Sequence, residues 1–188
     1  MKIKFYYFVF IVFIFALGCA NPPLAEMESA REAVFRAEND SDAVQYASST
    51  LARARDAVRR MQSEADSKNY EAVKTLAAEA IAAAEKAIID GRAGAQRAAG
   101  ESALLVAGLR PEIYETSGNV SAARYSLMDL DYDALERSII NAHNTVDLAE
   151  ADQAPGRYQD AIDKARAVRA DLFSINQTVA SAVIIVKK

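Results

Sequence analysis

The chain has 188 residues, of which 52% are hydrophobic and 26% charged, and its formal net charge is −4. Ala is the commonest residue with 39 copies, against 7 Gly, 4 Pro, 1 Cys and 1 His. Because Ala is the best helix former and Gly and Pro are the poorest, this composition predicts an all-α protein and excludes a collagen-like chain, a disulfide scaffold and a β-sandwich. One Cys and one His do not suffice for a Cys/His metal site, so we predict neither a metal nor a cofactor. The acidic balance argues against a nucleic-acid partner.

Residues 1–18 have the composition of a signal peptide. Lys2 and Lys4 form a short basic region, and an apolar run of 13 residues follows from Phe5 to Leu17. A membrane-spanning helix requires about 20 apolar residues, whereas an apolar segment of this shorter length is typical of a secretory signal. We therefore predict a signal peptide over residues 1–18.

The end of this segment, Ala16-Leu17-Gly18-Cys19, resembles the bacterial lipobox. In that motif a signal peptidase cuts after a small residue, and the thiol of the following Cys is lipidated. The resemblance implies cleavage between Gly18 and Cys19, with palmitate or related acyl chains on Cys19 that hold the protein at the membrane. Residues 19–23 would then be the lipidated Cys and its tether. The alternative is an ordinary signal peptide followed by an incidental Cys.

These features place the protein in the bacterial cell envelope. Some lipoproteins that stay at the inner membrane carry Asp directly after the lipidated Cys, whereas this chain has Ala20. We therefore expect the outer membrane, with the protein facing the periplasm, rather than the inner membrane.

Residues 24–188 are predicted to form a single α-helical domain of about six helices, packed as an antiparallel bundle or as stacked hairpins. Apolar residues recur at spacings of three and four, which puts them on one face of each helix. Gly108 is expected to end the third helix, and Pro111 to open the fourth. The last helix has the most sustained coiled-coil-like spacing. The expected helices span residues 24–37, 48–65, 69–107, 111–128, 131–149 and 155–186.

The two halves of this domain, 24–108 and 109–188, are candidate duplicates. The segment from Asn69 to Val73 aligns with the segment from Asp131 to Leu135, each opening with an aromatic residue that small residues follow at helical intervals. This pattern weakly resembles tetratricopeptide repeats, but the period differs and the characteristic Trp, Gly and Pro positions are not filled. We therefore predict a duplicated hairpin and not a long repeat array.

A series of motifs runs through residues 19 to about 90. After Cys19 come Pro22-Pro23, an Ala-rich helix, Tyr46-Ala47 and two further helices, the second opened by Tyr70. In this order the motifs resemble a family of small bacterial lipoprotein domains known only as a domain of unknown function. The resemblance implies an envelope role and offers no catalytic residues. Relatives often carry this domain ahead of a module, similar to outer-membrane protein A, that binds peptidoglycan; residues 108–188 show no β pattern of that kind.

The chain contains no pattern typical of an enzyme. Asp129, Asp131 and Asp133 are spaced like the start of an EF-hand loop, but Ala134 and Ile140 occupy the positions that require Gly and Glu, so we expect acidic residues at a helix N-terminus instead. The single His143 has no second His or Cys to form a metal site. Neither a Gly-x-Ser-x-Gly elbow nor a phosphate-binding Gly loop occurs. We therefore predict a protein that is not an enzyme.

Four Tyr residues, Tyr46, Tyr70, Tyr132 and Tyr158, open or flank the predicted helices. Tyr is enriched at protein interfaces, which makes them candidate interface residues. The alternative is that each bridges the core and the solvent at a corner between helices. The apolar stretch at residues 179–186 has two similar interpretations, since it either completes the bundle or docks on a partner.

Together these features predict a lipid-anchored envelope protein that acts as a non-catalytic protein-interaction or scaffolding module in the periplasm. Its expected partners are the membrane, through the acyl chains on Cys19, and another envelope protein. The alternative is a binding protein that holds peptidoglycan, lipid or another small ligand in a groove between helical hairpins.

Overall fold

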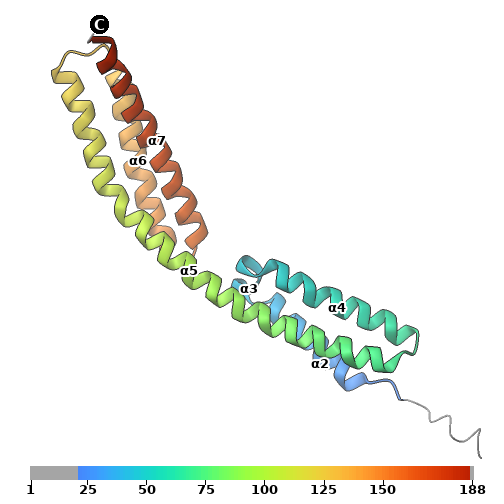
Figure 1. Ribbon diagram of the computed structural model, residues 1–188. Coiled ribbons are helices and arrows are strands. Elements are labelled where there is room, and N and C mark those ends of the chain that lie inside the picture. Colours follow the sequence, from blue (N-terminus) through green and yellow to red (C-terminus); the bar gives the residue numbers. More distant parts are fainter. Residues whose placement is uncertain (1–20, 187–188) are drawn as a thin grey trace, which may run out of the picture. The chain divides into compact units, whose positions relative to one another are not determined.

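A computed structural model describes residues 21–186, and the side chains of residues 21–182, as a succession of helices joined by short turns (Figure 1). No strand occurs in residues 21–186, so the predicted all-α fold is confirmed. The predicted signal peptide, and with it Gly18 and Cys19, lies outside the described residues. No helix among the described residues is long and apolar enough to cross a membrane. The helices are α2 (Leu24–Glu38), α3 (Ser41–Tyr46), α4 (Ser48–Asp66), α5 (Tyr70–Tyr125), α6 (Tyr132–Gln153) and α7 (Tyr158–Val186).

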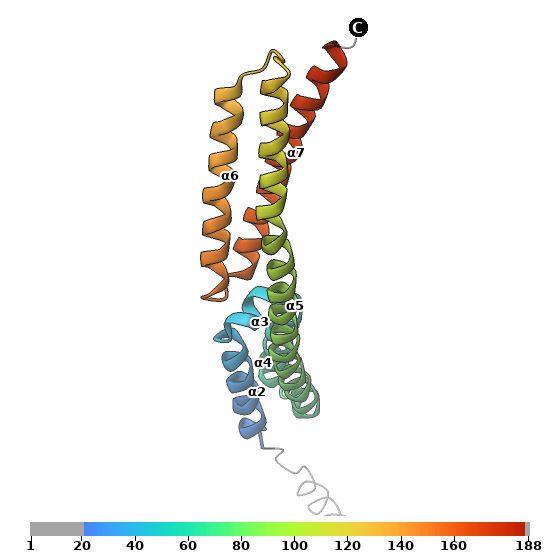
Figure 2. The same cartoon turned by 90° about the vertical axis from the view of Figure 1, so that its left-hand side faces the viewer.

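Tertiary contacts divide the chain into two compact units, and the boundary along the chain lies between Arg92 and Ala93. The halves compared in the sequence have their boundary between residues 108 and 109. The first unit contains α2, α3, α4 and the N-terminal part of α5, and the second contains the C-terminal part of α5 with α6 and α7 (Figures 1 and 2). Within each unit three long helices run up, down and up.

The core of the first unit is built largely from Ala. Only a few larger side chains, such as Leu51, Met61 and Val73, are fully buried among them. A seam of Ala lets neighbouring helices approach closely, as the sequence predicts. Leu24, the first residue of α2, is not part of this core and is 67% exposed. The buried Ala residues are Ala30, Ala33, Ala37, Ala43, Ala47, Ala54, Ala57, Ala77, Ala80, Ala83, Ala84 and Ala87.

The sequence predicts no helix between the expected helices 24–37 and 48–65, but the short helix α3 lies in this interval. Asp40 caps it, since its Oδ1 accepts a hydrogen bond of 2.9 Å from the Ala43 amide. The backbone of α3 lies directly against Gly91 of α5, where a Cβ atom would be 2.5 Å from the Ala43 nitrogen and 2.6 Å from the Asp42 carbonyl carbon. A six-residue helix is too short to show periodicity, so this packing could not be read from the spacing of apolar residues.

The core of the second unit is built from larger aliphatic residues. In α7 the residues at strict spacings of three and four are buried, and Ile162, which lies outside that spacing, is buried as well: Ala161, Ala165, Val168, Leu172, Ile175 and Val179 follow the spacing. Those of α6 are also confirmed: Leu135, Ile139, Ala142, Val146 and Ala149. Because Val179 packs into this core, the start of the apolar C-terminal stretch belongs to the second unit; the side chains beyond residue 182 lie outside the described part. Pro155 lies in the turn before α7 and does not open that helix.

The predicted helix boundary at Gly108 and Pro111 is wrong, because α5 continues through both residues to Tyr125. A Pro inside a helix costs about 3 kcal/mol, since it removes one backbone hydrogen bond and crowds the preceding turn. Pro111 has no amide hydrogen to donate to the Ala107 carbonyl. Both residues are exposed, so water can hydrogen-bond to that carbonyl instead. Leu109 and Ile113 on the opposite face are fully buried, and each buried side chain of this size contributes about 1.5–3 kcal/mol. Packing of the unit therefore outweighs the local break signal.

The long helices of the two units correspond in their buried positions. Residues of α4 and α5 match residues of α6 and α7 at a constant offset of 88 residues, as for Leu51 and Ile139 or Ala54 and Ala142. The sequence comparison instead aligned the start of α5 with the start of α6. Duplication itself stays a prediction, but the buried pattern pairs α4 with α6 and α5 with α7. The further pairs are Met61 with Ala149, Val73 with Ala161, Ala77 with Ala165, Ala80 with Val168, Ala84 with Leu172 and Ala87 with Ile175.

Candidate interaction surface

The four Tyr residues predicted as interface candidates are all half-buried. Tyr70, Tyr132 and Tyr158 are the first residues of α5, α6 and α7, and Tyr46 is the last residue of α3. The structure therefore places them at the corners between helices, and does not gather them on one surface.

Tyr132 shows what such a corner residue does. Its hydroxyl donates a hydrogen bond of 2.8 Å to the Met128 carbonyl, and the Arg124 guanidinium lies 4.8 Å from the centre of its ring. Arg124 also contacts Glu136 at 2.8 Å. These contacts tie the end of α5 to the start of α6, which matches the alternative interpretation of Tyr as a bridge between core and solvent.

The most exposed aromatic residues of the described chain are two further Tyr. Tyr114 is 83% exposed and Tyr125 is 89% exposed, and both belong to the C-terminal part of α5 together with Leu104, which is 79% exposed. The expected helix break at residues 108–111 separates Leu104 from the two Tyr, whereas the continuous helix places all three on one element.

These residues belong to a continuous surface that we call the outer stripe. Its seven members follow one another at alternating spacings of three and four residues, all are exposed and none is charged. Figure 2 views the second unit from the side on which this part of α5 lies in front, and neither α6 nor α7 covers it. The outer stripe comprises Leu104, Ala107, Pro111, Tyr114, Gly118, Ser121 and Tyr125.

Most charged residues of this part of α5 lie to the sides of the outer stripe and pair with α6 or α7, and Glu115 is exposed beside the stripe. Arg110 contacts Asp147 and Glu150 of α6, both at 2.8 Å. Hydrogen bonds that Arg110 donates, chiefly to Glu150 and then to Asp147, hold the pKa of its guanidinium above the ordinary value. On the other side of α5, Glu101 and Glu112 contact Arg166 and Arg169 of α7 at 2.7 Å. Ion pairs therefore border the outer stripe on both sides and leave its centre apolar.

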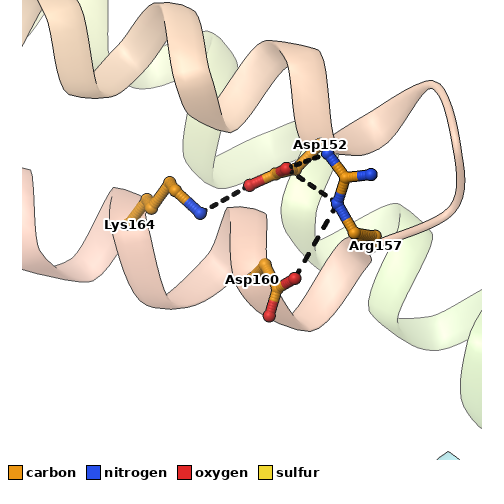
Figure 3. A network of polar contacts seen from close by, with 4 residues as sticks. All are labelled: Asp152, Arg157, Asp160 and Lys164. Atoms are coloured by element: carbon orange, nitrogen blue, oxygen red, sulfur yellow. Dashed lines mark hydrogen bonds and ion pairs between the residues drawn. The ribbon is translucent and has the colours of Figure 1, made fainter.

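A buried carboxylate closes the turn between α6 and α7 (Figure 3). Asp152 is only 7% exposed, and it accepts hydrogen bonds from Lys164 at 2.6 Å and from Arg157 at 2.9 and 2.5 Å. Lys164 first, and then Arg157, hold the pKa of the Asp152 carboxyl below its ordinary value. These contacts hold α7 against α6, because Asp152 belongs to α6 and Lys164 belongs to α7.

Each unit has a shallow groove among its described residues. One, of about 280 Å³, lies between α2 and α5 of the first unit and is lined by three Ala together with Glu26, Ser29, Lys74 and Ile81. The other, of about 390 Å³, lies between α5 and α7 of the second unit, and Asn119 and Asn176 line it. Asn119 donates to Asn176 at 2.9 Å, and Asn176 donates to the buried Thr116 hydroxyl at 2.9 Å. The side-chain amides at this groove are thus engaged in holding α5 and α7 together.

The residues weighed as metal ligands do not come together. Asp131 caps α6, since its Oδ1 accepts a hydrogen bond of 2.9 Å from the Ala134 amide, and His143 is exposed on the same helix. Among the described residues, no group of three or more His, Cys, Asp or Glu side chains is arranged to hold a metal ion.

One family model matches part of the chain. Residues 25–103 match the model of a domain of unknown function (DUF4398). The match covers α2, α3, α4 and the first part of α5, and so includes nearly all of the described first unit. No curated protein and no solved structure gives a significant match to the chain.

Proposed function

We propose that this protein is a lipid-anchored protein of the bacterial cell envelope whose helical units act as a non-catalytic interaction or scaffolding module. The observation that carries the proposal is the exposed outer stripe of α5, a surface of large and small uncharged side chains bordered by ion pairs. Contiguous exposed apolar surface of this kind is typical of a protein-interaction site.

The anchor is proposed from the sequence. Gly18-Cys19 follows a basic region and an apolar run, and α2 begins at Leu24, so only residues 20–23 would separate a lipidated Cys19 from the first helix. Such a short tether would confine the helical units to a thin layer beside the membrane, where a raised effective concentration favours even weak contacts. We expect this layer to lie on the periplasmic face of the outer membrane.

Labelling with radioactive palmitate tests the anchor. The wild-type chain is expected to incorporate the label and Cys19→Ser to lose it completely, because Cys19 is the only thiol in the chain. Ala20→Asp is the matched control: it keeps the thiol and the label, and it is expected to move the protein toward the inner-membrane fraction. Equal labelling of the wild type and Cys19→Ser would contradict the proposal.

In-cell crosslinking followed by affinity capture tests the module. A discrete envelope protein captured by the wild type but not by Cys19→Ser would support scaffolding. Capture of muropeptides instead would favour the second candidate, a peptidoglycan-binding protein, for which the groove beside Asn119 and Asn176 is the nearest match. If the two chains capture the same material, neither the anchor nor the scaffold role holds.

A further inference from the structure

The C-terminal part of α5 carries two apolar faces. The face toward the core follows a regular spacing of four and three residues and is covered by α6 and α7: Ser102, Val106, Leu109, Ile113, Thr116, Val120 and Ala123. The outer stripe has the same kind of spacing on the opposite side and is exposed. A face that repeats every 3.5 residues is the pattern by which helices pack in a left-handed coiled coil. The outer stripe is therefore suited to a second helix of similar length.

We propose that the outer stripe is a homodimer interface, at which α5 packs antiparallel against α5 of a second copy of this chain. The inference deepens the proposed function and rests on it, since it names one partner of the interaction module. An interface around a two-fold axis brings the same patch of both copies together, so the stripe must be complementary to itself.

One register makes the outer stripe self-complementary. In this register the two α5 helices run antiparallel, and the two-fold axis passes between them at the level of Thr116. Tyr114 then lies opposite the partner's Gly118, and Tyr125 lies opposite the partner's Ala107. Each aromatic ring then faces a position with little or no side chain, as a knob faces a hole. A Cβ atom at Gly118 would have no neighbour within 4 Å in the single chain, so the space beside this position is free to receive the ring.

The charges around the stripe tolerate this register. A two-fold axis brings the same border of each stripe together, so Arg110 lies beside the partner's Arg124, and Glu115 lies beside the partner's Glu115. Glu115 is exposed, so solvent and salt screen its charge. Because Arg110 and Arg124 are already paired with α6, they can remain at the solvated border of the interface.

The exposed area approaches what a small specific interface buries. In this register Leu104 lies opposite the partner's Met128, beyond the end of α5, so the contact runs from Ala107 to Tyr125 over about 27 Å at 1.5 Å per residue. Aromatic side chains bury about 150–250 Å² each, so the two Tyr provide about 300–500 Å² per copy, to which the small residues between them add. Specific interfaces bury about 600–1,000 Å² per partner, and the contact therefore approaches the lower end of that range.

Disulfide crosslinking tests the register. Two full-length chains with different tags are produced together in the same cells. One carries Tyr114→Cys and the other carries Gly118→Cys. Both also carry Cys19→Ser, so that each introduced thiol is the only thiol of its chain. Oxidation of the lysate is expected to join the two tags. Two Tyr114→Cys chains, or two Gly118→Cys chains, are expected to give much less product, because like positions lie further apart in this register. Equal yields from all three pairings, or no product, would overturn it.

Light scattering of the purified full-length chain in detergent tests dimerisation itself. The wild type is expected to have the mass of a dimer, and Tyr114→Asp to have that of a monomer, because it places a carboxylate at the centre of the interface. Phe173→Asp is the matched control: Phe173 is 70% exposed on α7, outside the stripe, and the dimer should persist. Circular dichroism checks that both variants fold. A monomeric wild type, or a dimeric Tyr114→Asp, would overturn the proposal.

The outcomes separate this inference from the proposed function. A monomeric wild type that still captures an envelope partner only when Cys19 is present refutes the dimer and leaves the scaffold role standing. A Tyr114-dependent dimer, with capture that does not depend on Cys19, supports the dimer and refutes the anchored scaffold.

Discussion

At the scale of single residues, Gly91 is a position with no space for a side chain. Its missing Cβ is what allows the backbone of α3 to lie against α5, since that atom would come within 2.5 Å of the Ala43 nitrogen. Backbone atoms cannot turn away as a flexible side chain can, so any substitution must displace α3 or bend α5.

We expect Gly91→Ala to destabilise the protein by about 1–3 kcal/mol, the usual cost of overpacking a filled site. Gly100→Ala is the matched control in the same helix. Gly100 is exposed and has no atom within 4 Å of the added Cβ, so Ala should stabilise the helix there by about 0.5–1 kcal/mol. Urea unfolding followed by circular dichroism measures both. Similar effects of the two substitutions would show that α3 does not rest on Gly91.

At the scale of elements, a buried ion network joins α6 to α7. Asp152 binds both Arg157 in the turn and Lys164 nearly two turns into α7, so that it connects the end of one helix to the first part of the next. The backbone supports the same turn, since the Arg157 amide donates to the Asp152 carbonyl at 2.9 Å and Gly156 adopts a positive φ of 81°. The turn is thus held by charge and by backbone geometry together.

This network predicts a pH dependence of stability. The pKa of Asp152 is lower in the folded chain than in the unfolded chain, where an Asp titrates near about 3.9. Its contribution to the free energy of unfolding is therefore fully present above that value and is lost as the pH falls through the lower, folded pKa. Wild type is expected to exceed Asp152→Asn in stability at pH 7, and the difference should shrink below about pH 4.

Asp160→Asn is the control for this experiment. Asp160 also contacts Arg157, but at 3.9 Å and with an exposed side chain, and an exposed pair contributes little. Denaturant unfolding between pH 3 and pH 7 compares the three chains. A difference between the wild type and Asp152→Asn that does not change with pH would refute the role of the ionised carboxylate.

At the scale of the whole molecule, the two units differ in the size of their buried side chains. The first is filled mainly by Ala and the second by Val, Leu and Ile. Each buried CH₂ group contributes about 0.8 kcal/mol, so the second unit gains more from burial. Hydrogen exchange followed by mass spectrometry should therefore find faster exchange in α2 and α4 than in α6 and α7. Equal protection of both units would show that close helix packing compensates for the smaller side chains.

Much of the fold follows from the sequence alone. The Ala content and the spacing of apolar residues determined the all-α class, the buried faces of α6 and α7 and the capping of α6 by Asp131, because these depend on propensities and periods within one helix. The lipobox-like segment is also a sequence signal, and the function drawn from it stays a proposal.

Tertiary structure decided what depends on neighbours. Pro111 and Gly108 favour a break in isolation, and α5 passes through them because Leu109 and Ile113 are buried against other helices of the second unit. The same packing leaves the outer stripe continuous and exposed, while the half-buried Tyr132 is drawn into contacts with its own unit. The local sequence determines the helix propensity of a segment. The free energy of burial, summed over many residues, determines where that propensity is outweighed and which surface stays exposed.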